Sequence, residues 1–356
     1  MPKQIAKEIE SLYVKLYNRI SMIKFGEKLP SYRQLLQEYE CSRQVLNKTL
    51  QKLQADGVII IEDRIGIFAN LKNNDYQKKI IFSHADWVCE HIKYFSRELE
   101  NQLKKQGNYI FMELPYAPDA IDSLPDKLKN SNADLILLDL ENFDCSTIGK
   151  LESIMDKIIF FESSPMLHKI NAIDLQPFFS GMMAAQHLIE LGHREIALIA
   201  SEPRLFPNKE KIYGFLDYLK LHGVKPKIID CKIKSGFAAA SFTADFMDNY
   251  VKNNPIDFTA CFALSNSSAL EVIKVLRANN IRVPEDVSVI GCSGENYDLS
   301  QEVELSSISY NYEKIIEVTA KNIELFFRTG RCGTTRIPPI LIQNSSTTKY
   351  VKKELV

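Results

Sequence analysis

From residue 79 onward, short apolar runs alternate with stretches of helical periodicity, and this alternation restricts the possible folds more than any other feature. The apolar runs, rich in Ile, Val, Phe and Leu, occupy 79–83, 108–114, 134–140, 157–162, 195–200, 227–231, 258–264 and 287–292. Helical patterns separate most of them, at 90–106, 120–130, 178–191, 208–222, 238–252 and 267–280. Near-continuous apolar strands between helices are typical of parallel sheets with helices on both faces. About 280 residues exceed a comfortable single core, so we predict an α/β fold with two lobes.

The N-terminal part of the chain follows a different pattern, that of three helices and a hairpin. Apolar residues at three- and four-residue spacing predict a helix over 3–22. Ser31 and Ser42 are placed to cap two further helices. Two β-rich runs, at 58–62 and 65–69, then predict a hairpin. Three helices followed by a hairpin are typical of a winged helix-turn-helix domain.

Charge is divided unevenly along the chain. The whole chain has a net charge of −1, which by itself argues against a nucleic-acid partner. Residues 1–79 hold 14 Lys and Arg against nine Asp and Glu, or +5, whereas residues 80–356 hold 30 against 36, or −6. A basic unit joined to an acidic one suggests a nucleic-acid-binding module at the N-terminus. The polar run 71–79 is the expected linker between the first domain, 1–70, and the two-lobed domain, 80–356.

The cysteines and the first residues indicate the cellular compartment. Seven scattered cysteines without a CxxC pair indicate a reducing cytoplasm, not a disulfide framework. The first 25 residues carry charges every few positions, so no signal-peptide core fits. The longest uncharged stretch that looks apolar, 175–189, is too short and too polar to span a bilayer. We therefore expect a cytoplasmic protein without a membrane partner.

The segment 29–68 carries a specific combination of residues. It contains LPSYR at 29–33, SR at 42–43, the pattern L-x-x-L-x-x-x-G-x-I from residue 50, and a glycine in the wing. This combination resembles the gluconate-repressor (GntR) family of winged-helix DNA-binding domains. The resemblance implies double-stranded operator DNA as a partner. The candidate DNA contacts are Ser31, Tyr32, Arg33, Ser42, Arg43, Gln44, Asn47, Lys48, Arg64 and Gly66.

The chemistry of these residue types agrees with a DNA-binding role. Arg43 and Gln44 follow the predicted cap of the third helix, where side chains can reach guanine and adenine edges in a major groove. Arg33, on the preceding helix, is a candidate for a phosphate contact that fixes the register. Lys48 and the hydroxyl of Tyr32 are weaker candidates for phosphate contacts.

Two positions depart from the pattern of the family. Asn47 stands where a second arginine is frequent, and Arg64-Ile65-Gly66 replaces the usual Gly-x-Gly of the wing. Arg64 is a further phosphate candidate. These departures leave the base preference and the placement of the wing open. The alternative for Arg33 and Arg43 is an ordinary solvated surface position.

Two stretches farther along the chain carry a second resemblance. They are GMMAAQHLIELGHREIALIA at 181–200, with YGF at 213–215, and IRVPEDVSVIGCSGENYDLSQEVELSSIS at 281–309. Both resemble the effector domain of the lactose/galactose-repressor (LacI/GalR) family, itself similar to periplasmic sugar-binding proteins. The resemblance implies two α/β lobes joined by three crossovers, with a small molecule in the cleft between them. It places lobe 1 at about 80–174 and 309–336, lobe 2 at about 175–308 and 337–349, and the crossovers near Asp174, Ser306–Ser309 and Ile337.

The candidate ligand-binding residues lie where the strands are expected to end. Ligands of parallel α/β sheets bind beyond the carboxyl ends of the strands, where loops supply polar groups. Loop positions of this kind are Asp86, Trp87, Glu162, Asn266, Ser293 and Glu295. The resemblance adds Lys211, at a position where the family usually has a ligand-gripping arginine. Phe237 and Trp87 can stack on a sugar face.

Several of these assignments have alternatives. Sugar-binding members of the family usually have an aspartate, within a GxDD pattern, where this chain has Ser293-Gly294. Either Glu295 replaces that carboxylate or the ligand differs. Plain core packing is the alternative for Trp87 and Phe237, and a solvated helix position is the alternative for Lys211.

Metal and enzyme chemistry find no support in the sequence. His84, Cys89 and His91 lie close together, but their spacing matches no recognised zinc pattern. Walker A, HExxH, GxGxxG and GxSxG motifs do not occur in the sequence. We therefore predict no catalytic residue, no bound metal and no cofactor.

The sequence thus predicts a ligand-responsive bacterial transcription regulator that acts as a repressor of carbohydrate-related genes. A homodimer would bind a pseudo-palindromic operator, and a small polar molecule, a sugar or sugar derivative, would change its affinity for DNA. Two alternatives come from other classes of protein. One is a solute-binding protein of the periplasmic type, and the other is a sugar-processing α/β enzyme.

Overall fold

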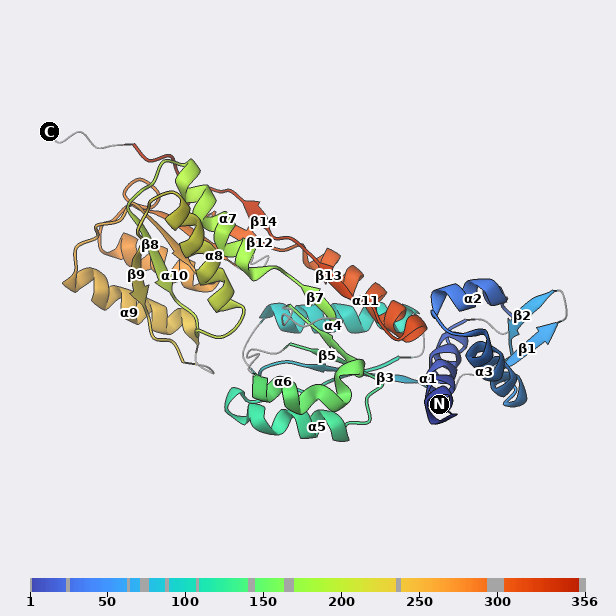
Figure 1. The fold of residues 1–356 in the computed structure, drawn as a ribbon. Helices are drawn as coiled ribbons and strands as arrows, with labels where there is room; N and C mark the ends of the chain where they lie inside the picture. The colour runs from blue at the N-terminus through green and yellow to red at the C-terminus, as the bar shows by residue number, and fades with distance from the viewer. Residues whose placement is uncertain are drawn as a thin grey trace.

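The computed structural model has three parts in a row, namely an N-terminal domain followed by two α/β lobes (Figure 1). The structure describes residues 2–23, 26–62, 65–70, 77–86, 90–106, 109–139, 145–162, 170–234, 238–292 and 304–351. Five predicted site residues lie outside these ranges: Arg64, Trp87, Phe237, Ser293 and Glu295. None of the described helices is long and apolar enough to cross a membrane.

The N-terminal domain, called the reader below, has the predicted order of three helices and a hairpin. Its elements are α1 (Pro2–Ile20), α2 (Tyr32–Glu38), α3 (Arg43–Ala55), β1 (Ile59–Glu62) and β2 (Gly66–Ala69). Leu16 and Ile20 of α1 are buried against Leu46 and Leu53 of α3 in one core. Gly57 ends α3 in the left-handed conformation at φ 71°, which lets the chain turn sharply into β1.

Lobe 1 is built on a six-stranded parallel sheet in the order β13-β7-β6-β5-β3-β4. Its strands are β3 (Lys78–Ser83), β4 (Tyr109–Glu113), β5 (Leu135–Leu138), β6 (Ile158–Phe160), β7 (Asn171–Asp174) and β13 (Thr334–Arg336). One face of the sheet packs on α4 (Glu90–Gln106) and α11 (Tyr312–Thr329). The other face packs on α5 (Leu124–Asn130) and α6 (Cys145–Leu151). Helices therefore cover both faces, as the continuous apolar runs require.

Lobe 2 has a second six-stranded sheet, in the order β14-β12-β11-β10-β8-β9, in which only the edge strand β14 is antiparallel. Its strands are β8 (Ile196–Ala200), β9 (Lys227–Asp230), β10 (Ala260–Ala263), β11 (Ser288–Cys292), β12 (Ser306–Ser309) and β14 (Ile340–Ile342). Its helices are α7 (Pro177–Glu190), α8 (Asn208–Leu221), α9 (Ala239–Asn253) and α10 (Asn266–Ala278). The parallel sheets and the winged helix-turn-helix confirm the predicted fold class.

Two glycines explain the motifs GMM and YGF. At Gly181 of α7, a Cβ would lie 1.8 Å from the carbonyl oxygen of Lys211 in α8. At Gly214 of α8, a Cβ would lie 1.9 Å from the carbonyl oxygen of Phe178 in α7. Each glycine therefore admits the backbone of the facing helix, and a side chain at either position would force the two helices apart.

The chain passes between the lobes three times. It leaves the sheet of lobe 1 after β7 to begin α7, and it returns after β12 through Tyr310 to begin α11. After β13 it crosses again to form β14 at the edge of lobe 2. The hydroxyl groups of Ser180 in α7 and Tyr310 are 2.5 Å apart, which ties α7 to the second crossover.

The structure corrects three sequence expectations. Helix α11 was not expected, although its buried residues recur at helical spacing from Ile315 to Phe327. The helix expected over 120–130 is a 3-10 turn followed by α5, because Pro125 begins a new helix at its first turn. The linker expected over 71–79 ends earlier, because Lys78 already begins β3 and is buried.

Two buried histidines of lobe 2 hold the segment that follows β14. Nε2 of His187 is 2.9 Å from Oγ1 of Thr347. Nε2 of His193, in the LGHR turn, is 3.0 Å from the carbonyl oxygen of Thr348, so this nitrogen carries the proton. Burial lowers the pKa of both histidines, so the folded state favours their neutral form.

Acid is therefore expected to destabilise lobe 2. Below pH 6.5 the unfolded chain takes up protons that buried His193 resists, so stability falls by up to about 1.4 kcal/mol per pH unit for each such histidine. Urea unfolding at pH 7.5 and pH 5.5 measures this loss. His193→Gln should have a lower free energy of unfolding at pH 7.5, but this free energy should fall less on acidification than in wild type. In the control His222→Gln, at an exposed position, it should fall as much as in wild type. Equal losses in all three chains would contradict the assignment.

Candidate nucleic-acid interface and effector cleft

The exposed face of α3 carries four of the predicted DNA contacts. Arg43, Gln44, Asn47 and Lys48 are all exposed, and their spacing of three and four residues places them on one side of the helix. The opposite side of α3 is buried in the core of the reader. Within the described part of the chain, no hydrogen bond or ion pair occupies the side chains of these four residues. Their donors and acceptors are therefore available to a partner.

The N-terminus of α2 lies beside the N-terminus of α3. The hydroxyl of Tyr32 donates a hydrogen bond of 3.3 Å to the carbonyl oxygen of Arg43, which ties the two helix ends together. Ser42 caps α3, because its Oγ accepts from the amide of Val45 at 3.2 Å. Arg33, in the first turn of α2, is exposed. Two helix N-termini, each with an exposed arginine, thus form one surface suited to phosphate and base edges.

Ser31 has a structural role at this surface. Its Oγ accepts from the amide of Gln34, and its own amide donates to Oε1 of Gln34 at 2.8 Å, so the two residues form a capping box. Ser31, Tyr32 and Ser42 therefore all make contacts that position the helices. Of the predicted DNA contacts, Arg33 and the four residues of the α3 face remain unoccupied among the described residues.

The base of the wing contains a cation that sequence reasoning missed. At Gly66, with φ 148°, a Cβ would lie 2.5 Å from Cε of Lys28, so a side chain there would displace the end of the lysine. The ammonium of exposed Lys28 is 5.9 Å from the ring centroid of Phe68 in β2. Its position before α2 gave no sequence signal, because the antiparallel contact with Phe68 is visible only in the fold.

The predicted ligand residues occupy loops and helix ends of both lobes. Asp86 is exposed after β3, and Glu162 follows β6 with φ 64°. Lys211 is half-buried in α8, and its Nζ donates to Oδ1 of Asn208 at 3.3 Å. Asn266 is the first residue of α10 and is only 4% exposed.

Glu162 and Lys211 converge on the second crossover. The carboxylate of Glu162 contributes to raising the pKa of buried Tyr310, although burial itself is the largest cause. Lys211 acts in the opposite direction on Cys292 at the end of β11, where burial raises the pKa of the thiol and the nearby ammonium lowers it. Residues of lobe 1 and lobe 2 thus meet electrostatically around Tyr310.

Two acidic groups that sequence reasoning did not place in the cleft lie at the first crossover. Burial raises the pKa of Asp174, whose Oδ1 accepts from the amide of Gln176 at 2.8 Å. Burial and the charge of Asp174 together raise the pKa of Glu210, the neighbour of Lys211 in α8. Half-buried carboxyl groups of this kind suit hydrogen bonds to a polar ligand.

Asn266, a predicted ligand contact, also makes contacts within lobe 2. Its Oδ1 accepts from Oγ of Ser307 at 2.7 Å. A Cβ at Gly291 would lie 2.5 Å from the same oxygen, so the side chain fills the space between α10 and two strands. In this arrangement Asn266 holds the N-terminus of α10 against β11 and β12, and its oxygen accepts one hydrogen bond.

The described residues do not meet the requirements of a metal site, and they form a hollow on lobe 1. No group of three or more His, Cys, Asp or Glu side chains in the described ranges is placed to hold a metal ion. A hollow of about 370 Å³ lies along α4 and the edge strand β4, apart from the predicted ligand residues. Its lining residues are Lys93, Ser96, Arg97, Glu100, Phe111 and Glu113.

Comparison with known families separates the chain into the same two kinds of unit. Residues 9–69 match the family described as bacterial regulatory proteins of the gntR family. Residues 185–347 match the periplasmic binding protein-like domain.

Characterised relatives are transcription regulators by name. The HTH-type transcriptional regulator CelR of Thermobifida fusca is 34% identical over 128 residues, which cover 35% of each chain. The HTH-type transcriptional regulator DegA of Bacillus subtilis is 28% identical over 167 residues, which cover 46% of this chain and 48% of DegA. The chain thus spans about a third to a half of the length of these relatives.

Solved structures share the fold of the two lobes. A LacI family regulator from Silicibacter pomeroyi aligns with a TM-score of 0.67 at 16% identity, covering 76% of this chain and all of that one. The lac repressor dimer bound to operator and the anti-inducer ONPF aligns with a TM-score of 0.64 at 16% identity, covering 77% and 95%. A LacI family regulator from Enterococcus faecium with bound ribose aligns with a TM-score of 0.62 at 21% identity, covering 77% and 100%.

These relatives and structural neighbours are regulators and not enzymes. Both resemblances that the sequence motifs suggested are confirmed. The chain joins a segment that matches the helix-turn-helix domain of the bacterial gntR family to a segment that matches a periplasmic binding protein-like domain, and its two lobes have the fold of LacI-family regulators.

Proposed function

We propose that this chain is a bacterial transcription regulator whose reader binds operator DNA under the control of a small molecule in the cleft between the lobes. The observation that carries the proposal is the exposed α3 face of Arg43, Gln44, Asn47 and Lys48 beside exposed Arg33. The reader, residues 1–70, is the basic part of the chain, whereas the lobes are acidic. The phosphates of DNA are therefore attracted to the basic reader and repelled by the acidic lobes.

We infer that a homodimer binds a pseudo-palindromic operator. One winged helix reads only a few base pairs, so specific binding by a two-fold dimer requires two half-sites. The lac repressor neighbour is a dimer on its operator, which supports this arrangement for a chain with the same lobe fold. In this arrangement Arg43 and Gln44 read bases, and Arg33 and Lys48 contact phosphates.

We infer that the effector is a sugar or a related polyhydroxylated molecule. The groups near the crossovers are carboxyls, hydroxyls and the ammonium of Lys211, which can each form hydrogen bonds with ligand hydroxyls. Structural neighbours with bound ribose, glucose and sucrose support this class of ligand. The effector acts by favouring one angle between the lobes, and it can do so only by binding one state more tightly than the other.

The remaining parts of the proposal follow from the same chemistry. Scattered cysteines, three of which are buried in lobe 2, suit a reducing cytoplasm where DNA is the partner. We propose that the regulator is a repressor of carbohydrate-related genes. A repressor that leaves its operator when it binds a sugar is the simplest way for that sugar to control such genes. A solute-binding protein or a sugar-processing enzyme would have no use for the exposed α3 face.

Replacing Arg43 should weaken specific DNA binding. Loss of a bidentate base contact costs about 1–3 kcal/mol, so the Kd of Arg43→Ala should rise by roughly 5- to 150-fold. The measurement is fluorescence anisotropy on a DNA duplex selected in vitro with the full chain, at several salt concentrations. Lys48→Ala should reduce the slope of log K against log salt by about one, because it removes one phosphate contact.

The control for that experiment is Arg282→Ala. Arg282 is paired with Asp286 after α10 of lobe 2, so the variant loses the same charge away from the reader. It should bind the selected DNA like wild type. Wild-type binding that does not weaken with salt, or an Arg43→Ala variant with unchanged affinity, would refute the DNA-binding proposal.

A thermal-shift screen of sugars tests the cleft. A ligand that binds only the folded state must raise the melting temperature of the chain. Lys211→Ala should lose most of that rise, because a hydrogen bond from an ammonium contributes about 1.5–3 kcal/mol, or roughly 10- to 150-fold in affinity. Lys220→Ala, an exposed lysine at the other end of α8, should keep the full rise. If Lys211→Ala also kept the full rise, Lys211 would not contact the ligand.

A further inference from the structure

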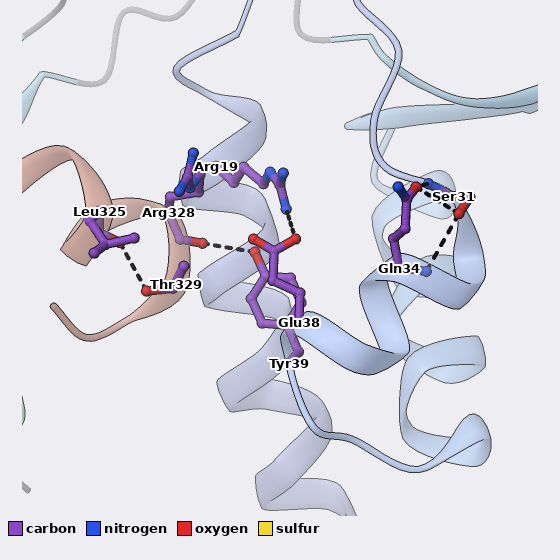
Figure 2. Close-up of polar contacts among 8 residues, drawn as sticks. All are labelled: Arg19, Ser31, Gln34, Glu38, Tyr39, Leu325, Arg328 and Thr329. Carbon is purple, nitrogen blue, oxygen red and sulfur yellow. Dashed lines mark hydrogen bonds and ion pairs between the residues drawn. The ribbon is translucent and has the colours of Figure 1, made fainter. Parts of the chain in front are cut away.

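The C-terminal end of α11 in lobe 1 is capped by the reader. The hydroxyl of Tyr39, which follows α2, donates a hydrogen bond of 2.7 Å to the carbonyl oxygen of Arg328 in the last turn of α11 (Figure 2). The final carbonyls of a helix have no partner within it, so this contact satisfies a group that would otherwise need water. Burial raises the pKa of the Tyr39 phenol, which keeps the hydroxyl protonated as a donor.

The first helix of the reader also packs against the end of α11. Gly330 ends α11 at φ 81°, and a Cβ there would lie 2.7 Å from Cε of Lys15 in α1. Glycine at this position adopts the left-handed turn, and the side chain of Lys15 lies directly beside it. On the reader side, Arg19 of α1 forms an ion pair of 2.9 Å with Glu38 of α2, which braces the two helices that meet α11 (Figure 2).

A buried polar contact closes the junction at the start of β3. Lys78 is only 3% exposed, its ammonium donates to Oδ1 of Asn18 in α1, and it lies 5.7 Å from the ring centroid of Phe327 in α11. Burial lowers its pKa to about 8. A long charged side chain is buried only where packing and partners hold it, so this contact indicates a fixed junction.

An apolar contact lies beside the buried lysine. Met22, just after α1, packs against the core cluster of lobe 1, and the hydroxyl of Tyr109 in β4 is 3.9 Å from its sulfur. The junction therefore combines apolar packing with two polar contacts, one through Tyr39 and one through Lys78. A flexible tether would need neither.

Helix α11 connects this junction to the boundary between the lobes. It has 18 residues, which corresponds to a length of about 27 Å. Asn311 caps its N-terminus directly after Tyr310, whose hydroxyl contacts Ser180 of lobe 2. Its buried face, which includes Ile315, is part of the core of lobe 1. One rigid helix thus begins at a crossover and ends beside the reader (Figure 1).

We propose that the reader docks on the C-terminal end of α11 and turns with lobe 1 as one rigid body. When lobe 1 rotates at the crossover, the DNA-reading face of α3 moves with it. The length of α11 separates this face from the crossover, so a small rotation produces a larger displacement. The regulatory meaning of this docking rests on the proposed function, but the docking itself does not. Coupling by rigid-body rotation needs no ordering of a linker segment on DNA.

Backbone ¹⁵N relaxation of the full chain, without DNA or sugar, tests the docking. Amides of the reader and of lobe 1 should give the same rotational correlation time. In the double variant Met22→Ser with Tyr39→Phe, the reader amides should give a clearly shorter correlation time, as a small domain on a tether does. Tyr39→Phe alone should give an intermediate value, because it removes one hydroxyl and leaves the packing of Met22 intact.

The control is Tyr13→Phe, which removes a hydroxyl that bonds within the reader, to Oδ2 of Asp56 at 2.6 Å. It should lower the stability of the reader and leave the shared correlation time unchanged. A wild-type reader that tumbles faster than lobe 1 would overturn the docking. A double variant that still tumbles with lobe 1 would show that Met22 and Tyr39 do not hold the reader, and would overturn their role in the docking. Neither outcome uses DNA, so failure of DNA binding by the wild type would refute the proposed function separately.

Discussion

Both lobes depend on burying parallel strands that are apolar on two faces. Strands such as β5 and β10 have every residue buried, so helices must cover both sides of each sheet. Apolar side chains then fill strands such as these, and acidic side chains such as Asp174 lie at strand ends. The two sheets are joined by crossovers, and the half-buried side chains of Asp174, Glu210 and Tyr310 lie at or beside these crossovers. These groups thus lie where buried strands lead into the crossovers.

The same constraint fixes the position of α11 between the crossover and the reader. Its apolar face is required to cover the sheet of lobe 1, so the helix cannot bend away from the lobe. Its ends are therefore fixed where the lobe ends, at Tyr310 beside α7 and at Arg328 under the reader. Tight packing makes such an element move as a unit, and this allows a small change at a crossover to reach a distant surface.

Local signals were enough to predict the reader, and five of the predicted DNA contacts, Arg33, Arg43, Gln44, Asn47 and Lys48, lie exposed on it. Caps at Ser31 and Ser42, the apolar stripe of α1 and the glycine after α3 all act within a few residues. Helix α11 carried the same kind of signal, with Asn311 as cap and Gly330 as stop, and was overlooked. Its prediction was therefore possible from the sequence alone.

The remaining features depend on contacts between residues far apart in the chain. Tyr39 and Arg328 are separated by 289 positions, so no local pattern could indicate their hydrogen bond. The contacts of Asn266 with Gly291 and Ser307 likewise join positions that are distant in the sequence. Lys78 looked like part of a polar linker, because its burial arises only when the reader packs on lobe 1.

The proposal that a sugar controls DNA binding is tested most directly by measuring how DNA and sugar change each other's affinity for the chain. The affinity for the selected DNA would be measured with and without a saturating sugar that raises the melting temperature, and the affinity for that sugar with and without the DNA. A coupling free energy of about 1–3 kcal/mol predicts changes of roughly 5- to 150-fold, and both affinities must change by the same factor. A sugar that binds in the cleft and leaves the DNA affinity unchanged would contradict the account.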